Sequence, residues 1–173
     1  MHGVWYCTGG VPSSQPLFTV RQADATDIPL LAYHRAAMFR DMGKLASDRH
    51  RALTDATASY LAGALPDGEY LAWVAQDTDP SAAVIGGAGA QLRPILPRPR
   101  AGGELELGPE AIILNVYVEV GWRRRGVGEA LMRTVLDALA VRGIRRIVLH
   151  AADDGRRLYE RLGFVPTNEM RLE

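Results

Sequence analysis

One stretch of the chain, Ala111 to Glu129, joins an apolar run directly to a turn rich in arginine and glycine, where an amphipathic helix begins. The run AIILNVYVEV is mostly β-branched and aliphatic, and it predicts a buried strand over 111–120. The turn that follows places Gly126 and Gly128 at the start of the helix. Free backbone N–H groups and the helix dipole favour an anion at such a position, and glycine lets phosphate oxygens approach the main chain. The stretch therefore predicts a phosphate-binding turn.

The spacing of this turn differs from the common nucleotide-binding signatures. It is Arg123-x-x-Gly126-x-Gly128, with no GxxxxGK[ST] and without the third glycine of GxGxxG. A second motif, GRRLYERLGF over 155–164, follows after one expected helix and one expected strand.

Together the two motifs resemble those of the acetyl-CoA-dependent N-acetyltransferases, the GNAT superfamily. In that family Q/R-x-x-G-x-G/A follows a strand, and a later helix ends in L-Y-x-x-x-G-F. The resemblance covers about residues 18–173. It implies an α/β (α+β) GNAT-like fold with a mixed central sheet of about six or seven strands, flanked by about four helices. Val120, Ala152, Ile112 and Leu114 depart from the family pattern, the last two where many members carry a glutamate base.

The rest of the chain fits one domain over 17–173, preceded by a flexible Gly-, Ser- and Pro-rich leader over 1–16. A helix is expected from Thr26 or Asp27 to Gly43. The other expected helices cover about 53–65, 127–142 and 155–162, and the expected strands cover 18–22, 70–76, 83–92, 104–107, 111–120 and 145–151, with a final strand pair after Phe164. Strands 111–120 and 145–151 should be parallel neighbours joined by a right-handed crossover.

Composition excludes several classes of protein. Lysine plus arginine equals aspartate plus glutamate at 20 each, so no net charge calls for nucleic acid or a membrane surface. The single cysteine excludes an internal disulfide, and the four histidines lack metal-ligand spacing, so no metal is expected. No secretion signal or membrane span is evident, which predicts a cytoplasmic protein. A homodimer is left open.

The resemblance implies that acetyl-CoA binds with its pyrophosphate over Arg125 to Glu129 and its pantetheine beside strand 111–120. The backbone groups of Val118 and Val120 would pair with the pantetheine, and the Val118 N–H would polarise the thioester carbonyl as an oxyanion donor. The full expected cofactor set is Val118, Val120, Arg123, Arg124, Arg125, Gly126, Val127, Gly128 and Glu129.

The resemblance also makes Tyr159 the expected general acid. A phenol with a pKa of roughly 10 can protonate a departing thiolate, whereas the alternative is that Tyr159 only packs in the core. The base is left open among Glu119, Asn115 acting through a water, His150 and Glu110. A water chain without a dedicated base is favoured over each of them.

The expected activity is transfer of an acetyl group to a primary amine by direct attack in a ternary complex. A catalytically silent acyl-CoA-binding or regulatory module on the same fold is the alternative. The acceptor is expected to be a small amine or an amino-acid-like molecule. Its pocket is expected to use Arg35, Glu104, Asn115 and Glu119, with loop 93–110 as one wall.

Overall fold

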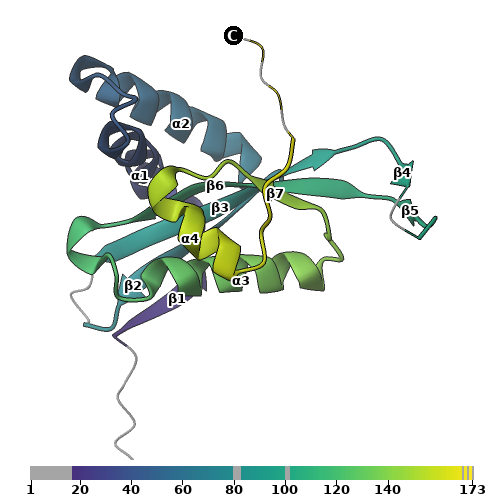
Figure 1. Cartoon of the computed structure of the whole chain (residues 1–173). Helices are drawn as coiled ribbons and strands as arrows, with labels where there is room; N and C mark the ends of the chain where they lie inside the picture. Colours follow the sequence, from purple (N-terminus) through teal and green to yellow (C-terminus); the bar gives the residue numbers. More distant parts are fainter. Residues whose placement is uncertain (1–16, 80–82, 100–101, 169, 171, 173) are drawn as a thin grey trace, which may run out of the picture.

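A five-stranded mixed sheet is the centre of the molecule (Figure 1). The computed structural model describes residues 17–79, 83–99, 102–168, 170 and 172, so the expected leader over 1–16 lies outside the described residues. The strand order is β1-β2-β3-β6-β7. These strands are β1 (Phe18–Gln22), β2 (Tyr70–Asp77), β3 (Val84–Pro94), β6 (Pro109–Val118) and β7 (Ile147–Leu149). The first four pair antiparallel, and β6 pairs with β7 in parallel, as predicted for the crossover.

Helices cover both faces of this sheet. They are α1 (Ile28–Asp41), α2 (His50–Ala64), α3 (Val127–Val141) and α4 (Asp153–Arg161). Leu31 of α1 and Leu61 of α2 pack against β2 in one buried cluster. Leu131 and Val135 of α3 belong to a second and larger cluster, with α4 at its border. The mixed sheet flanked by four helices confirms the predicted fold class, with five strands in the central sheet and two in a separate small sheet in place of the six or seven expected in one sheet.

Three expectations about strands need correction. Residues 165–168, 170 and 172 form no strand, so the final strand pair predicted after Phe164 is absent from the described residues. Pro166 lacks the N–H that a ladder requires, which explains the break. Strand β6 ends at Val118, and a 3-10 turn, η3 (Val120–Trp122), replaces its last expected residues. The expected strand over 104–107 forms only a small hairpin, β4 (Arg98–Pro99) with β5 (Leu105–Glu106).

Asn115 interrupts the regular alternation of β6. Its φ of 58° lies in the left-handed region, and the register with β3 shifts between Gly87 and Gly89. Such a bulge puts consecutive side chains on one face of a strand. Leu114 and Asn115 both face α1 and α2, and the alternation then continues with Tyr117 on that side and Val118 toward α3.

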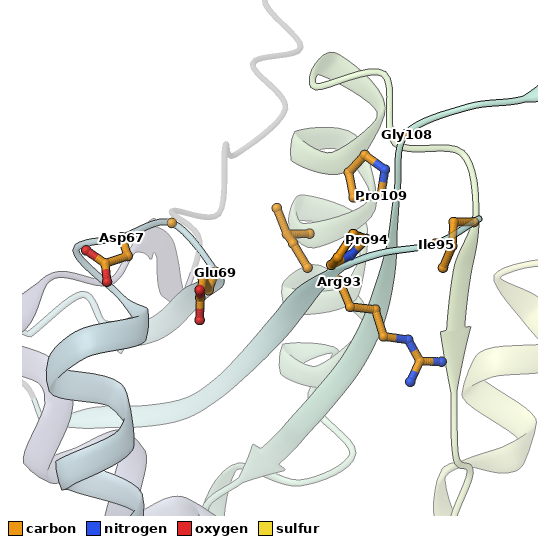
Figure 2. Close-up of a pocket in the computed structure, with 9 residues that line it drawn as sticks. Asp67, Glu69, Arg93, Pro94, Ile95, Gly108 and Pro109 are labelled. Atoms are coloured by element: carbon orange, nitrogen blue, oxygen red, sulfur yellow. The ribbon is translucent and has the colours of Figure 1, made fainter. Parts of the chain in front are cut away.

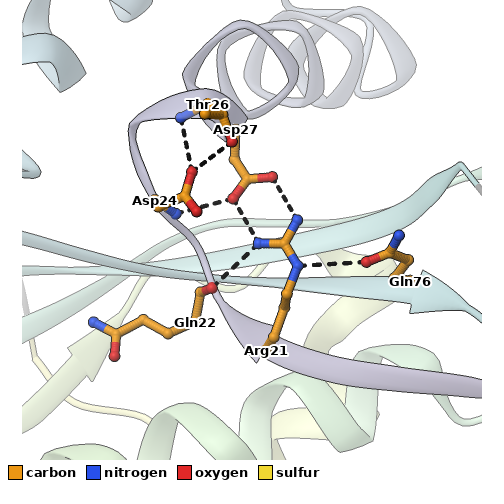
Figure 3. A network of polar contacts seen from close by, with 6 residues as sticks. All are labelled: Arg21, Gln22, Asp24, Thr26, Asp27 and Gln76. Carbon is orange, nitrogen blue, oxygen red and sulfur yellow. Dashed lines mark hydrogen bonds and ion pairs between the residues drawn. The ribbon is translucent and has the colours of Figure 1, made fainter.

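A hydrogen-bonded corner fixes the start of α1 relative to the sheet (Figure 3). The Asp24 side chain caps a short 3-10 turn, η1 (Ala25–Asp27), and the Asp24 N–H in turn donates a hydrogen bond to the Asp27 carboxylate. Arg21 of β1 donates two hydrogen bonds, of 2.7 and 2.8 Å, to the buried Asp27 carboxylate. The α-helix therefore begins at Ile28, directly after the predicted Asp27, while the side chain that caps the preceding 3-10 turn is that of Asp24. This corner anchors the helix that carries His34 and Arg35.

Within the described part of the chain, none of the helices is both long and apolar enough to cross a bilayer.

Candidate active site

The predicted phosphate-binding turn lies at the N-terminus of α3. Gly126 is the residue before the helix, its φ is 83°, and no side chain caps the first turn. Ala130 N–H makes the first intrahelical bond, to Gly126 O. The N–H groups of Val127, Gly128 and Glu129 therefore have no acceptor within the helix. This is the arrangement of donors that an anion requires.

The three arginines of the turn have different surroundings. Arg123 donates to Asp41 of α1 at 2.5 Å and to the Val118 carbonyl at 3.0 Å, so it ties the turn to the end of α1. Arg124 is exposed and has a left-handed φ of 64°. The Arg125 guanidinium stacks on Trp122, 5.2 Å from the ring centroid. Arg124 and Arg125 thus leave positive charge at the surface beside the free N–H groups.

The outer edge of β6 is open beside this turn. Pairing with β7 covers only Ala111 to Ile113, and no other strand of the described part of the chain pairs with the later residues of β6 on that side. Because the Glu119 N–H donates to Ile85 O, Val118 and Gly86 form a non-hydrogen-bonded pair. The Val118 N–H therefore points away from β3, toward the open edge.

The backbone of Val120 was expected to be exposed on the strand, but Val120 lies beyond the end of β6. It opens the 3-10 turn η3, and its carbonyl accepts a hydrogen bond from the Arg123 N–H at 3.3 Å. Of the two expected pantetheine partners, Val118 alone lies on β6.

Tyr159 lies on α4, beside the end of β6. A Cβ on Gly128 would be 3.6 Å from Leu158 and 3.8 Å from Val118, so the three positions adjoin one another. The Tyr159 ring packs edge-on against Phe164 and close over Gly155, where an added Cβ would come within 2.8 Å of the ring. Burial raises the pKa of Tyr159, so its hydroxyl is protonated at neutral pH.

A cavity of about 330 Å³ adjoins the bulge of β6 on the side of α1 and α2. Arg35 donates a 2.5 Å hydrogen bond to Asn115 Oδ1, and Asn115 Nδ2 donates to the Tyr70 hydroxyl at 2.8 Å. The Gln91 amide donates to the Tyr60 hydroxyl at 2.8 Å. Arg35 and Asn115 are thus brought together as expected for an acceptor pocket. The lining residues are Arg35, Ala56, Thr57, Tyr60, Leu61, Tyr70, Gln91, Leu114 and Asn115.

The sequence did not indicate that Tyr70, Tyr60 and Gln91 line this cavity. The one relevant signal was the glycine run of β3, which indicated a bulge or close packing at these positions. The structure has the bulge, as a register shift between Gly87 and Gly89, and the close packing, because Gly89 lies against the Tyr70 hydroxyl.

We expect Gly89→Ala to destabilise the protein by about 1–3 kcal/mol, because overpacking forces buried side chains to move. A Cβ at Gly89 would lie 2.0 Å from the Tyr70 hydroxyl oxygen, and Tyr70 is buried. Urea unfolding measures the change. Gly63→Ala, in α2 with no atom within 4 Å of the added Cβ, is the matched control and should stabilise slightly. An unchanged unfolding midpoint for Gly89→Ala would contradict the packing described.

His34 and Glu119 form a second polar group on the same side of β6. His34 is buried, and its Nε2 lies 3.4 Å from Glu119 Oε1. Neither ring nitrogen of His34 has a hydrogen-bond partner among the described residues. Burial lowers the pKa of His34 to about 4, so the imidazole is neutral at neutral pH. Glu119 is partly exposed and follows Val118 directly.

Glu104 and loop 93–110, both expected in the acceptor pocket, do not line the cavity with Arg35. Glu104 is exposed beside the hairpin β4–β5, which projects beyond the central sheet (Figure 1). None of the described residues of loop 93–110 is among those that line this cavity. Their part in acceptor binding stays a prediction.

Glu110 is held in a buried ion-pair network. Its carboxylate accepts from Arg93 at 2.5 Å and from Arg146. Burial opposes ionisation of Glu110, but the hydrogen bonds from the two arginines outweigh it, and the net effect lowers the pKa. A carboxylate so engaged is a poor base. His150, the other candidate, is exposed after the end of β7.

A larger cavity, of about 430 Å³, lies at the start of β6 (Figure 2). Asp67 and Glu69 line one side of it, and Arg93, Pro94 and Pro109 line the other. This cavity is larger than the one beside Asn115, but it lies at the end of β6 opposite the glycine turn. Its position therefore argues against it as the reaction site. No group of three or more potential metal ligands comes together within the described residues.

Comparisons with known proteins agree with this geometry. The model of the acetyltransferase (GNAT) family matches residues 33–164. A GCN5-related N-acetyltransferase from Ralstonia eutropha JMP134 is 34% identical with a TM-score of 0.78, over 90% of this chain and 97% of that one. A predicted acetyltransferase from Clostridium acetobutylicum, crystallised with acetyl-CoA, is 25% identical with a TM-score of 0.74, over 90% and 96%.

Glucosamine-6-phosphate N-acetyltransferase from Arabidopsis thaliana shares the fold at 12% identity, with a TM-score of 0.65 over 90% of this chain and 97% of that one. No curated sequence matches the chain.

Proposed function

The chain belongs to the acetyltransferase (GNAT) family, and from that premise we propose that it transfers the acetyl group of acetyl-CoA to a primary amine by direct attack in a ternary complex. The observation that carries the proposal is the open edge of β6 beside an uncapped helix N-terminus. The start of α3 offers backbone donors for a pyrophosphate, and the open edge of β6 offers backbone groups for the amides of the pantetheine. The similarity to a protein crystallised with acetyl-CoA supports the same choice of donor.

The pyrophosphate would be held by the N–H groups of Val127, Gly128 and Glu129. Arg124 and Arg125 would add charge at the rim, and Arg123 would hold the turn against Asp41. Glu129 keeps its own charge compensated by Arg133 at 2.8 Å and by Arg161 at 3.7 Å. The pantetheine would extend along β6 toward the bulge at Asn115.

In the chemical step the amine nitrogen forms a bond to the thioester carbon, and the carbon–sulfur bond then breaks. The Val118 N–H, directed toward the open edge, stabilises the oxygen that gains negative charge. Tyr159 donates its proton to the departing thiolate. Burial raises the pKa of Tyr159, so the phenol carries its proton when the thiolate forms and can donate it or a hydrogen bond.

We assign the acceptance of the amine proton to Glu119. Its neighbours leave the carboxylate partly exposed beside Val118, whereas Glu110 is occupied by two arginines. His34 acts as a positioning residue, because its neutral imidazole can donate from Nε2 to the Glu119 carboxylate. The separation of 3.4 Å is longer than a usual hydrogen bond, and such contacts shorten when substrate binds.

A silent acyl-CoA-binding module on the same fold is the rival function. Release of free CoA thiol from acetyl-CoA over a broad panel of amines, together with isothermal titration of acetyl-CoA, separates the two. We expect both binding and amine-dependent thiol release. Binding without thiol release for any amine would favour the rival.

A further inference from the structure

Arg35 is a half-buried cation without a counter-ion among the described residues. Its guanidinium donates to a neutral amide, Asn115 Oδ1, and lies 5.0 Å from the centroid of the Phe39 ring. A guanidinium carries five N–H donors, so most of its capacity remains available. Partial removal of a charge from water costs free energy unless an opposite charge lies beside it.

Apart from Arg35, the described residues that line the cavity are uncharged. Thr57, Tyr60 and Tyr70 bring hydroxyl groups and Gln91 and Asn115 bring amides, and the other lining residues are Ala56, Leu61 and Leu114. A diamine or polyamine would need carboxylates here, because its second ammonium group would otherwise meet the positive charge of Arg35. The charge of the cavity favours an anionic group on its ligand.

The conformation of Asn115 holds the guanidinium in place. The left-handed φ of Asn115 directs its side chain into the cavity, and the Tyr70 hydroxyl fixes the amide through its Nδ2 group. Gly89 leaves room for that hydroxyl. Arg35 is therefore presented in a fixed orientation, which suits the two-point binding of a planar carboxylate.

We infer that the acceptor is a small amine that also carries a carboxylate, and that Arg35 binds this carboxylate in the cavity beside Asn115. The inference rests on the proposed acetyl transfer and names the chemical class of its acceptor. A cavity of about 330 Å³ suits a molecule of the size of an amino acid. The amine would then lie toward Val118, where β6 is open.

The test compares matched pairs of acceptors that differ only in charge. Glycine, β-alanine, 4-aminobutyrate, 6-aminohexanoate and lysine are each assayed as the acid and as the carboxamide, and CoA release is measured. For the best-used pair we expect the acid to have a kcat/KM roughly 10–100-fold above that of the amide, as a charge-assisted pair provides. Equal use of acid and amide by the wild type would overturn the inference.

Variants assign the preference to Arg35. Arg35→Gln should lower the kcat/KM of the acid, chiefly through KM, and leave the amide nearly unchanged. Arg35→Lys should retain part of the preference. Arg51→Gln removes the same charge from an exposed position on α2 and serves as the control. A preference for acids that survives Arg35→Gln would show that another residue binds the carboxylate.

A binding measurement keeps this inference distinct from the proposed function. Titration of the CoA-loaded protein with 4-acetamidobutyrate and with its amide requires no turnover. Preferential binding of the acid that Arg35→Gln abolishes would support the carboxylate site even if no amine is acetylated. Equal binding of both, together with measurable acetylation, would remove the carboxylate site and leave the transferase intact.

Discussion

Gly126→Asp should weaken acetyl-CoA binding by at least about 100-fold while the protein remains folded. Aspartate tolerates the left-handed conformation that Gly126 adopts, and no atom lies within 4 Å of the added Cβ. Its carboxylate at a helix N-terminus also favours the helix. The same charge would stand where the pyrophosphate binds, and two like charges about 4 Å apart repel by about 4 kcal/mol near a protein surface. Isothermal titration with acetyl-CoA measures the loss.

Gly126→Asn is the matched control, because asparagine has the same shape and backbone tolerance without the charge. We expect its affinity for acetyl-CoA to fall far less than that of Gly126→Asp. Equal affinities for the two variants would mean that no phosphate lies at this turn. Unfolding curves of both variants verify that the helix is intact.

Tyr159→Phe should lower kcat by about 100-fold or more, the lower range for loss of a general acid. Phenylalanine retains the edge-on contact with Phe164 and the packing over Gly155, so the free energy of unfolding should change little. The dissociation constant of acetyl-CoA should also remain close to that of the wild type. Steady-state kinetics at saturating acetyl-CoA gives kcat, and titration gives the binding constant.

A result in which kcat is unchanged would assign Tyr159 to packing alone. A fall in both stability and affinity would indicate that the hydroxyl has a structural partner instead. The proposed role requires that kcat alone falls.

Local sequence patterns predicted the turn and most of the elements correctly. The strand, the glycine turn and the helix from Ala111 onward are consecutive in the sequence, so local patterns alone were enough to predict their types and their order. The parallel pairing of β6 with β7 follows from the helix α3 that connects the two strands. The strand pair expected after Phe164 is absent from the described residues, where Pro166 lacks the N–H that a strand ladder requires.

The acceptor cavity depended on contacts that no local pattern reveals. Arg35 and Asn115 are 80 positions apart, and they meet because a register shift between β3 and β6 turns Asn115 toward α1. Tyr70 enters the site because Gly89, which pairs with Ala72 on the neighbouring strand, leaves room for the Tyr70 hydroxyl. Glu104 was expected there as a carboxylate of loop 93–110, and the structure places it beside the β4–β5 hairpin, apart from the residues that line this cavity.

The central claim is that acetyl-CoA lies along the open edge of β6 with its pyrophosphate at the start of α3. A crystal structure of the protein with acetyl-CoA bound tests this most directly. We predict pyrophosphate oxygens within roughly 2.7–3.2 Å of the N–H groups of Val127, Gly128 or Glu129, and the thioester carbonyl facing the Val118 N–H. Acetyl-CoA bound elsewhere, for example in the cavity beside Asp67 and Arg93, with the glycine turn empty, would contradict the claim.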